Sequence, residues 1–124
     1  MRIGRRIDGD PGIMVDGQAV ETELVEAVDR IAGLAQKLGL GGPALIAASL
    51  EGITDVEIHR ARGVGARIRK PSAWLGSARL DDLIAPTADH LQDLMEALWL
   101  VGGWDDGSPY FAEGHWTGYG RKDS

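Results

Sequence analysis

A basic cluster in the middle of the chain offers the clearest binding chemistry. Residues 58–80 contain six lysines and arginines and no acid. Guanidinium groups bind phosphates and carboxylates through paired hydrogen bonds. This basic island could therefore bind a phosphate or an acidic partner. Its members are Arg60, Arg62, Arg67, Arg69, Lys70 and Arg79.

An acidic segment follows the basic island. Residues 81–113 contain eight acids and no lysine or arginine. The island could lie against these acids, or its arginines could protect an exposed strand edge from aggregation. We expect acids of residues 81–113 to form ion pairs with arginines of the basic island, within one chain or across a dimer interface. The arginines concerned are Arg60, Arg62, Arg67 and Arg69.

Catalytic and metal-binding motifs are hard to find in this sequence. The three histidines are 31 and 25 residues apart, which matches no helical metal motif. Asp105, Asp106 and His115 could ligate a metal, although the two aspartates are more typical of a turn with Gly107. We therefore expect no metal, no cofactor and a protein that is not an enzyme. A small metal-dependent hydrolase is the third alternative.

Aromatic residues gather near the C-terminus. Such rings can stack on bases, but a tail that folds back over an incomplete core would use the same residue types. Trp116 and Tyr119 are the candidates for binding. The full set is Trp99, Trp104, Tyr110, Phe111, Trp116 and Tyr119.

Two amphipathic helices are predicted around this chemistry. Apolar residues recur every three or four positions over 22–38, and Gly39 suits a left-handed stop. A second helix is predicted over 88–100, with Thr87 as N-cap and Gly102-Gly103 as its end. Its apolar stripe comprises Leu91, Leu94, Met95, Leu98 and Trp99.

Strands are predicted in three places. Residues 44–53 form an apolar run that fits helix or strand, and we favour strand. The basic island is expected to form a hairpin that turns at Gly63-Val64-Gly65. Asp16-Gly17, flanked by apolar residues, predicts a short N-terminal hairpin.

These elements predict one domain over 1–124 of the α+β class. We expect a small, mainly antiparallel sheet from residues 44–70, with both amphipathic helices on one face. Residues 1–21 form a turn-rich N-terminal segment and 22–104 the core. An irregular aromatic C-terminal tail, 105–124, closes the domain. The length of 124 residues and the hydrophobic content of 44% suit a single core.

Composition narrows the class of function. A net charge of −6 would repel a polyanion at long range. The chain has no cysteine, no signal-peptide pattern and no membrane-spanning run, so we expect a soluble cytoplasmic protein. The leading hypothesis is a non-enzymatic binding or regulatory module. It would engage itself as a homodimer, or a protein partner, through segregated charge. The alternative is a nucleic-acid-binding accessory protein that uses the basic island.

A partial resemblance covers about residues 41–117. The segments "GGPALIAASLEGITDVEI", "RLDDLIAP" and "LQDLMEALWLVGGWDDGSPYFAEGHW" are similar to the C-terminal portion of actinobacterial proteins with a Schlafen-type, AlbA-like nucleic-acid-binding domain. The start of that domain has no counterpart in residues 1–40. The resemblance implies an accessory lobe that binds a partner, and it carries no catalytic residue.

Overall fold

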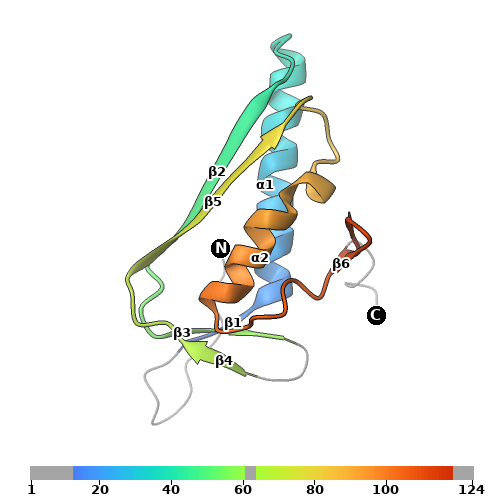
Figure 1. The fold of residues 1–124 in the computed structure, drawn as a ribbon. Helices are drawn as coiled ribbons and strands as arrows, with labels where there is room; N and C mark the ends of the chain where they lie inside the picture. Colours follow the sequence, from blue (N-terminus) through green and yellow to red (C-terminus); the bar gives the residue numbers. More distant parts are fainter. Residues whose placement is uncertain (1–12, 61–63, 119–124) are drawn as a thin grey trace.

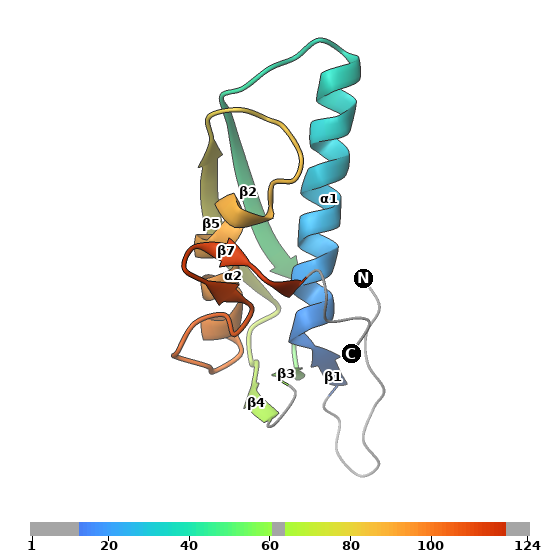
Figure 2. The same cartoon turned by 90° about the vertical axis from the view of Figure 1, so that its right-hand side faces the viewer.

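The computed structural model describes residues 13–60 and 64–118. Two helices lie on the same side of a long two-stranded ribbon (Figures 1 and 2). The predicted α+β class, with both helices on one face of a sheet, is confirmed. The elements are β1 (Ile13–Asp16), α1 (Gly17–Lys37), β2 (Ala44–Glu51), β3 (Val56–His59), β4 (Val64–Arg67), β5 (Ser72–Leu80), η1 (Ala88–Leu91), α2 (Gln92–Val101), β6 (Phe111–Ala112) and β7 (His115–Trp116).

The strands form three small sheets instead of the single sheet predicted from 44–70. β1, β3 and β4 form one, β2 and β5 the long ribbon, and β6 and β7 a short pair. Gly52 and Asp55 both have φ of 68°, and they turn the chain out of the ribbon between β2 and β3. β3 then pairs in parallel with β1 and antiparallel with β4. Residues 44–51 are a strand, as predicted.

The hairpin of the basic island is present as β3 and β4, although its turn is not where we predicted it. Val64 and Gly65 belong to β4, where Gly65 approaches the backbone of Gly102. Gly63 lies outside the described residues. A Cβ at position 65 would overlap the Gly102 carbonyl, so this glycine serves close packing of β4 against the end of α2.

Helix α1 begins at the residues that were expected to form a hairpin turn. Asp16 is its N-cap, and its Oδ1 accepts a hydrogen bond of 3.0 Å from the Gln18 amide. The hairpin prediction at Asp16-Gly17 is therefore wrong, because aspartate followed by glycine suits a helix start as well as a tight turn. At the other end, Gly39 has φ of 71°, which confirms the predicted stop.

The second helix is preceded by one 3₁₀ turn, η1. All five residues of its predicted stripe, Leu91 to Trp99, are fully buried. Thr87 is the N-cap residue of η1, as predicted for the start of this helix, but its side chain makes no cap hydrogen bond. Its hydroxyl instead donates to Asp29 Oδ1 on α1 at 2.7 Å, which ties η1 to α1. Gly102 and Gly103 end the helix as predicted.

The ribbon and the two helices enclose the core. Inward-facing residues of β2 and β5, such as Ile46 and Leu75, pack with the α1 and α2 stripes. In Figure 2, α2 lies over the β5 side of the ribbon and α1 over the β2 side. Neither helix of the described chain has the length and hydropathy to cross a bilayer.

Candidate functional site

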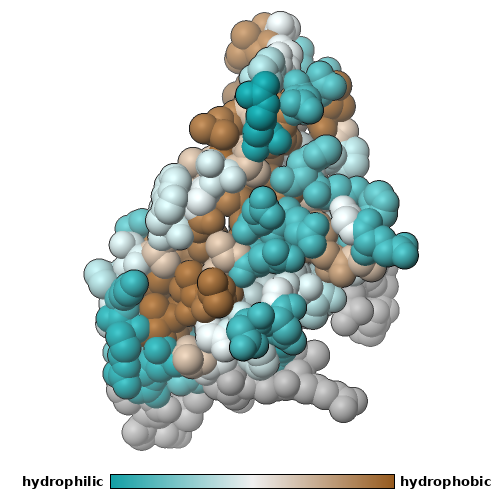
Figure 3. Space-filling view, viewed as in Figure 1, coloured by the Kyte–Doolittle hydropathy of each residue, from teal (hydrophilic) through white to brown (hydrophobic). Residues whose placement is uncertain are grey.

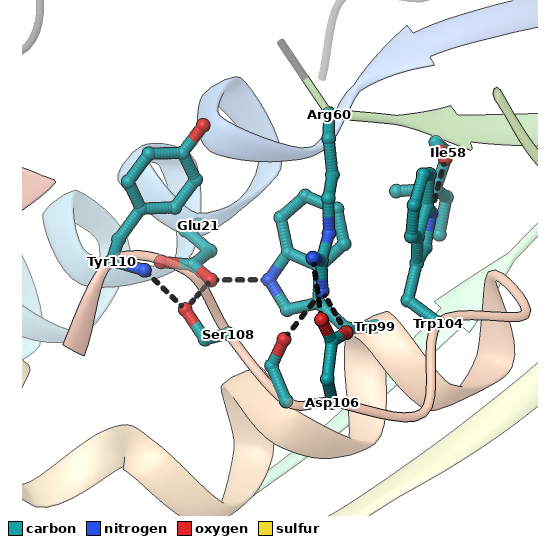
Figure 4. A network of polar contacts seen from close by, with 9 residues as sticks. Glu21, Ile58, Arg60, Trp99, Trp104, Asp106, Ser108 and Tyr110 are labelled. Atoms are coloured by element: carbon teal, nitrogen blue, oxygen red, sulfur yellow. Dashed lines mark hydrogen bonds and ion pairs between the residues drawn. The ribbon is translucent and has the colours of Figure 1, made fainter. Parts of the chain in front are cut away.

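Arg60, the first arginine of the basic island, is held between two tryptophan rings. Its guanidinium carbon lies 4.4 Å from the Trp104 ring centroid and 5.1 Å from that of Trp99 (Figure 4). Its terminal nitrogens donate to both carboxylate oxygens of Asp106, at 3.0 and 2.5 Å, and to the Gly107 carbonyl at 2.8 Å. The Arg60 guanidinium holds the pKa of Asp106 below its ordinary value. The two terminal nitrogens of Arg60 are thus hydrogen-bonded and its guanidinium lies near two aromatic rings, whereas its Nε is buried without a hydrogen-bond partner among the described residues.

A fully buried carboxylate, Glu21, lies on the other side of Trp99. Its Oε2 accepts hydrogen bonds of 2.5 Å from Trp99 Nε1 and from Ser108 Oγ. Its Oε1 accepts one of 2.7 Å from Trp116 Nε1. Three neutral donors therefore replace the water that this carboxylate loses on burial.

These contacts join parts of the chain that are far apart in sequence. Glu21 lies on α1, Trp99 on α2, and Ser108 and Trp116 in the C-terminal segment. Trp104 adds a contact to the sheet, since its Nε1 donates to the Ile58 carbonyl at 2.8 Å. Because Glu21 is fully buried, a solute cannot reach it in the folded state. We assign the Glu21 and Arg60 contacts to stability.

Two further arginines of the basic island form ion pairs with acids close to them in sequence. Arg67 pairs with Glu57 at 3.4 Å across the β3–β4 hairpin, and Arg69 with Asp55 at 3.9 Å. Asp106 of the acidic segment pairs with Arg60, as predicted, whereas the partners of Arg67 and Arg69 described here, Glu57 and Asp55, lie outside that segment. Strand register explains the difference, because β3 places Glu57 opposite Arg67. Arg62 lies outside the described residues.

The remaining candidate binding residues differ in how far they are exposed. Lys70 and Arg69 are exposed. Trp116 is 5% exposed and belongs to the core, so its ring faces are covered. Tyr119 lies outside the described residues.

Two of the three residues considered as metal ligands, Asp106 and His115, bind different partners. Asp106 binds Arg60, whereas His115 Nδ1 lies 3.0 Å from Asp89 Oδ2. The His115 contact, with a bond from the Trp116 amide, keeps the pKa of Asp89 below its ordinary value. Within the part of the chain that the structure describes, no three side chains of the His, Cys, Asp and Glu types are grouped to hold a metal ion.

An uncovered apolar surface runs along α1 and β2, and the sequence analysis did not predict it. We call it the α1–β2 flank and define it by Ile31, Leu34, Leu38, Leu40 and Leu45, which are 50–69% exposed. Leu45 is on the outer face of β2, since its neighbours Ala44 and Ile46 face the helices. Ile31, Leu34 and Leu38 recur at helical spacing, one position before the buried Ala32 and Ala35. Ile31 and Leu38 belong to the apolar pattern over 22–38 that predicted an amphipathic helix, but both are exposed, so the buried face of α1 is narrower than that pattern indicated.

The position of this stripe on α1 follows from the neighbours of the helix. Asp29, on the flank one position after the buried stripe, bonds to Thr87 of the η1 connection. The apolar stripe lies on the opposite flank, away from η1 and the C-terminal segment. In Figure 2, α1 runs along the β2 side of the ribbon, the side on which the edge of β2 is unpaired within the described residues.

The β2 strand leaves one edge unpaired. Within residues 13–60 and 64–118, β2 pairs with β5 alone. Its sequence ALIAASLE contains no lysine, arginine or proline and has its one charge at the last residue. β5 differs, because it carries Arg79 and a bulge near Gly76 that interrupts its register. β2 thus lacks the usual features that prevent edge-to-edge pairing.

Comparisons with known proteins gave no match. No protein-family model matches the chain, and searches of curated proteins and of solved structures gave no significant similarity. The resemblance to Schlafen-type, AlbA-like proteins therefore stays a prediction.

Proposed function

We propose that this chain is a non-enzymatic binding module that assembles as a homodimer through the α1–β2 flank. One observation carries the proposal: an unpaired, unprotected strand edge lies beside an uncovered apolar helix stripe. Either feature alone is a liability in a monomer. Together they fit a second copy of the same chain, which would supply a strand and an apolar helix at once.

A two-fold axis satisfies both features. Two antiparallel β2 strands paired about such an axis would convert two ribbons into one four-stranded antiparallel sheet. Both α1 helices would then lie on the same face of that sheet, with their apolar stripes in contact. None of the five flank residues is charged, and the one charge on β2, Glu51, is at the end of the strand.

We propose that apolar contact holds the dimer together, instead of the segregated charge expected from the sequence. Arg60 and Arg67 already have carboxylate partners within the chain and are largely covered. We therefore expect the dimer to persist as NaCl is raised to about 1 M, where the Debye length is only about 3 Å. Light scattering after size exclusion, repeated over a salt series, measures this directly.

A pair of matched variants tests the interface. Leu34→Lys places a charge in the helix stripe and should give a monomer with an unchanged circular dichroism spectrum. Leu100→Lys alters a leucine of similar exposure, 65% against 58%, that lies outside the flank, and should remain a dimer. If the unaltered chain is a monomer at all accessible concentrations, or if both variants dissociate alike, the proposed interface is wrong.

A further inference from the structure

A shallow groove lies where the β4–β5 connection meets the end of α2. It has a volume of about 330 Å³ and is lined by Ile68, Arg69, Lys70, Ala73, Leu100 and Val101. In Figure 3 the lower part of the surface shows an apolar patch bordered by hydrophilic side chains in this region. The groove is apart from the α1–β2 flank, because Ala73 pairs with Leu50 while Leu45 pairs with Arg79 near the opposite end of the ribbon.

The floor of the groove is apolar and incompletely covered. Ile68 is 6% exposed and forms its base, whereas Leu100 beside it is 65% exposed. Leu100 is the one uncovered position among the apolar residues 98–101 at the end of α2. A ligand with a large apolar side chain could cover Leu100 and gain the free energy of burying both surfaces.

The wall of the groove is cationic in an acidic protein. Arg69 and Lys70 are both exposed, and none of the six lining residues is acidic. Arg69 has one ion pair, to Asp55, and at 3.9 Å it is the longest in the described chain. An exposed pair of this length contributes little, so a carboxylate from a ligand can replace Asp55 at small cost.

We propose that this groove binds an extended peptide segment in which a large apolar side chain adjoins a carboxylate. The apolar side chain would lie over Ile68 and Leu100, and the carboxylate would meet Arg69 and Lys70. The groove is open and shallow, whereas small-molecule sites enclose most of their ligand. A side chain whose backbone stays on the surface fits this shape better. The carboxylate could come from an acidic residue or from a peptide C-terminus.

Heteronuclear NMR with synthetic peptides tests the proposal on the full chain. The probe is a blocked hexapeptide with the order glycine, serine, leucine, aspartate, serine, glycine. A second peptide replaces aspartate by asparagine, a third replaces leucine by alanine, and a fourth ends at leucine with a free carboxylate. We expect the probe to shift amide signals of residues 68–73 and 100–101. The second and third peptides should bind about tenfold more weakly. The fourth peptide should bind as tightly as the probe only if its C-terminal carboxylate can replace the aspartate side chain.

Variants on the protein side give matched controls. Leu100→Ser should weaken binding of the probe about tenfold, and Arg69→Gln with Lys70→Gln about fivefold, as expected for one apolar contact and exposed charge pairs. Ile84→Ser and Arg79→Gln, at exposed positions outside the groove, should leave it unchanged. Leu34→Lys should also bind the probe normally, which separates this site from the proposed dimer.

Three results would overturn the proposal. The first is the absence of shifts at the groove, and the second is equal binding of the aspartate and asparagine peptides. The third is binding of a single-stranded oligonucleotide, but not of the peptides, at residues 68–73, which would assign the cationic wall to nucleic acid.

Discussion

Replacement of Glu21 by alanine should be among the most damaging single changes in this protein. The carboxylate is fully buried and accepts hydrogen bonds from two indole nitrogens and one hydroxyl. Glu21→Ala leaves Trp99 Nε1 and Trp116 Nε1 buried without an acceptor, whereas the Ser108 hydroxyl can rotate.

The magnitude follows from those two orphaned donors. A buried donor that loses its partner costs about 1–3 kcal/mol, so two cost about 2–6 kcal/mol. The alanine variant no longer desolvates a charge, which offsets part of that loss. We expect the free energy of unfolding to fall by about 2–5 kcal/mol, a large share of the roughly 5–15 kcal/mol typical of a domain.

Glu21→Gln tests the two oxygens of the carboxylate separately. One amide oxygen can still accept from Trp99 and Ser108, but the amide nitrogen then faces the Trp116 donor. The loss should be smaller, about 1–3 kcal/mol, because one indole is orphaned instead of two. The indole N–H signal of Trp116 should move in both variants, and that of Trp99 mainly in the alanine variant.

Urea unfolding followed by tryptophan fluorescence measures these changes. Glu23→Ala is the matched control, since Glu23 lies on the same helix and is exposed. Its effect should stay within about 0.5 kcal/mol. If Glu21→Ala is no more harmful than Glu23→Ala, then Glu21 does not hold the helices and the C-terminal segment together.

Three further predictions concern packing and charge. Gly17→Ala should destabilise by about 1–3 kcal/mol in urea unfolding, because its Cβ would overlap the Trp99 ring, whereas Gly33→Ala, with open space around it, should stabilise α1 by about 0.5–1 kcal/mol. Leu98→Ala should cost about 2–5 kcal/mol, and an unchanged melting temperature would remove this side chain from the core. Asp89→Asn should cost at most about 1 kcal/mol at neutral pH, because the Asp89 carboxylate is 45% exposed. Since the folded-state pKa of Asp89 is below its ordinary value of 3.8, the difference from the unaltered chain should disappear in acid titrations as the pH falls below that value.

The two helices could be predicted because their apolar patterns are regular, whereas the apolar run of β2 fitted helix as well as strand. The α2 stripe repeats at three and four residues, and all five members are buried. β5 was missed because its sequence SAWLGSARL interrupts alternation at the Leu75-Gly76 bulge and contains several small residues. Such a segment becomes a strand through its partner β2, and pairing between distant segments leaves little local signal.

The polar core could not be predicted from residue type. Glu21 has the same side chain as Glu23 and Glu26, and acids of this type are usually exposed. Its helical spacing from Val25 and Val28 puts it on the buried face of α1, but residue type alone does not indicate that burial. What distinguishes Glu21 is its position at the contact with α2 and the C-terminal segment. The tryptophans that donate to it come 78 and 95 residues later in the chain. Donor and acceptor meet only in the folded protein.

Arg60 shows why counting charges along the chain misjudged the basic island. The count treats each arginine as surface charge, yet the Arg60 guanidinium lies within cation–π distance of two tryptophan rings and forms a bidentate pair with Asp106. Burial of a guanidinium is tolerable here because aromatic faces and two carboxylate oxygens replace its water. The exposed positive charge left on the described part of the island lies at Arg69, Lys70 and Arg79. Two of these three line the groove beside Leu100, so exposed positive charge and apolar surface occur together there although the net charge of the chain is −6.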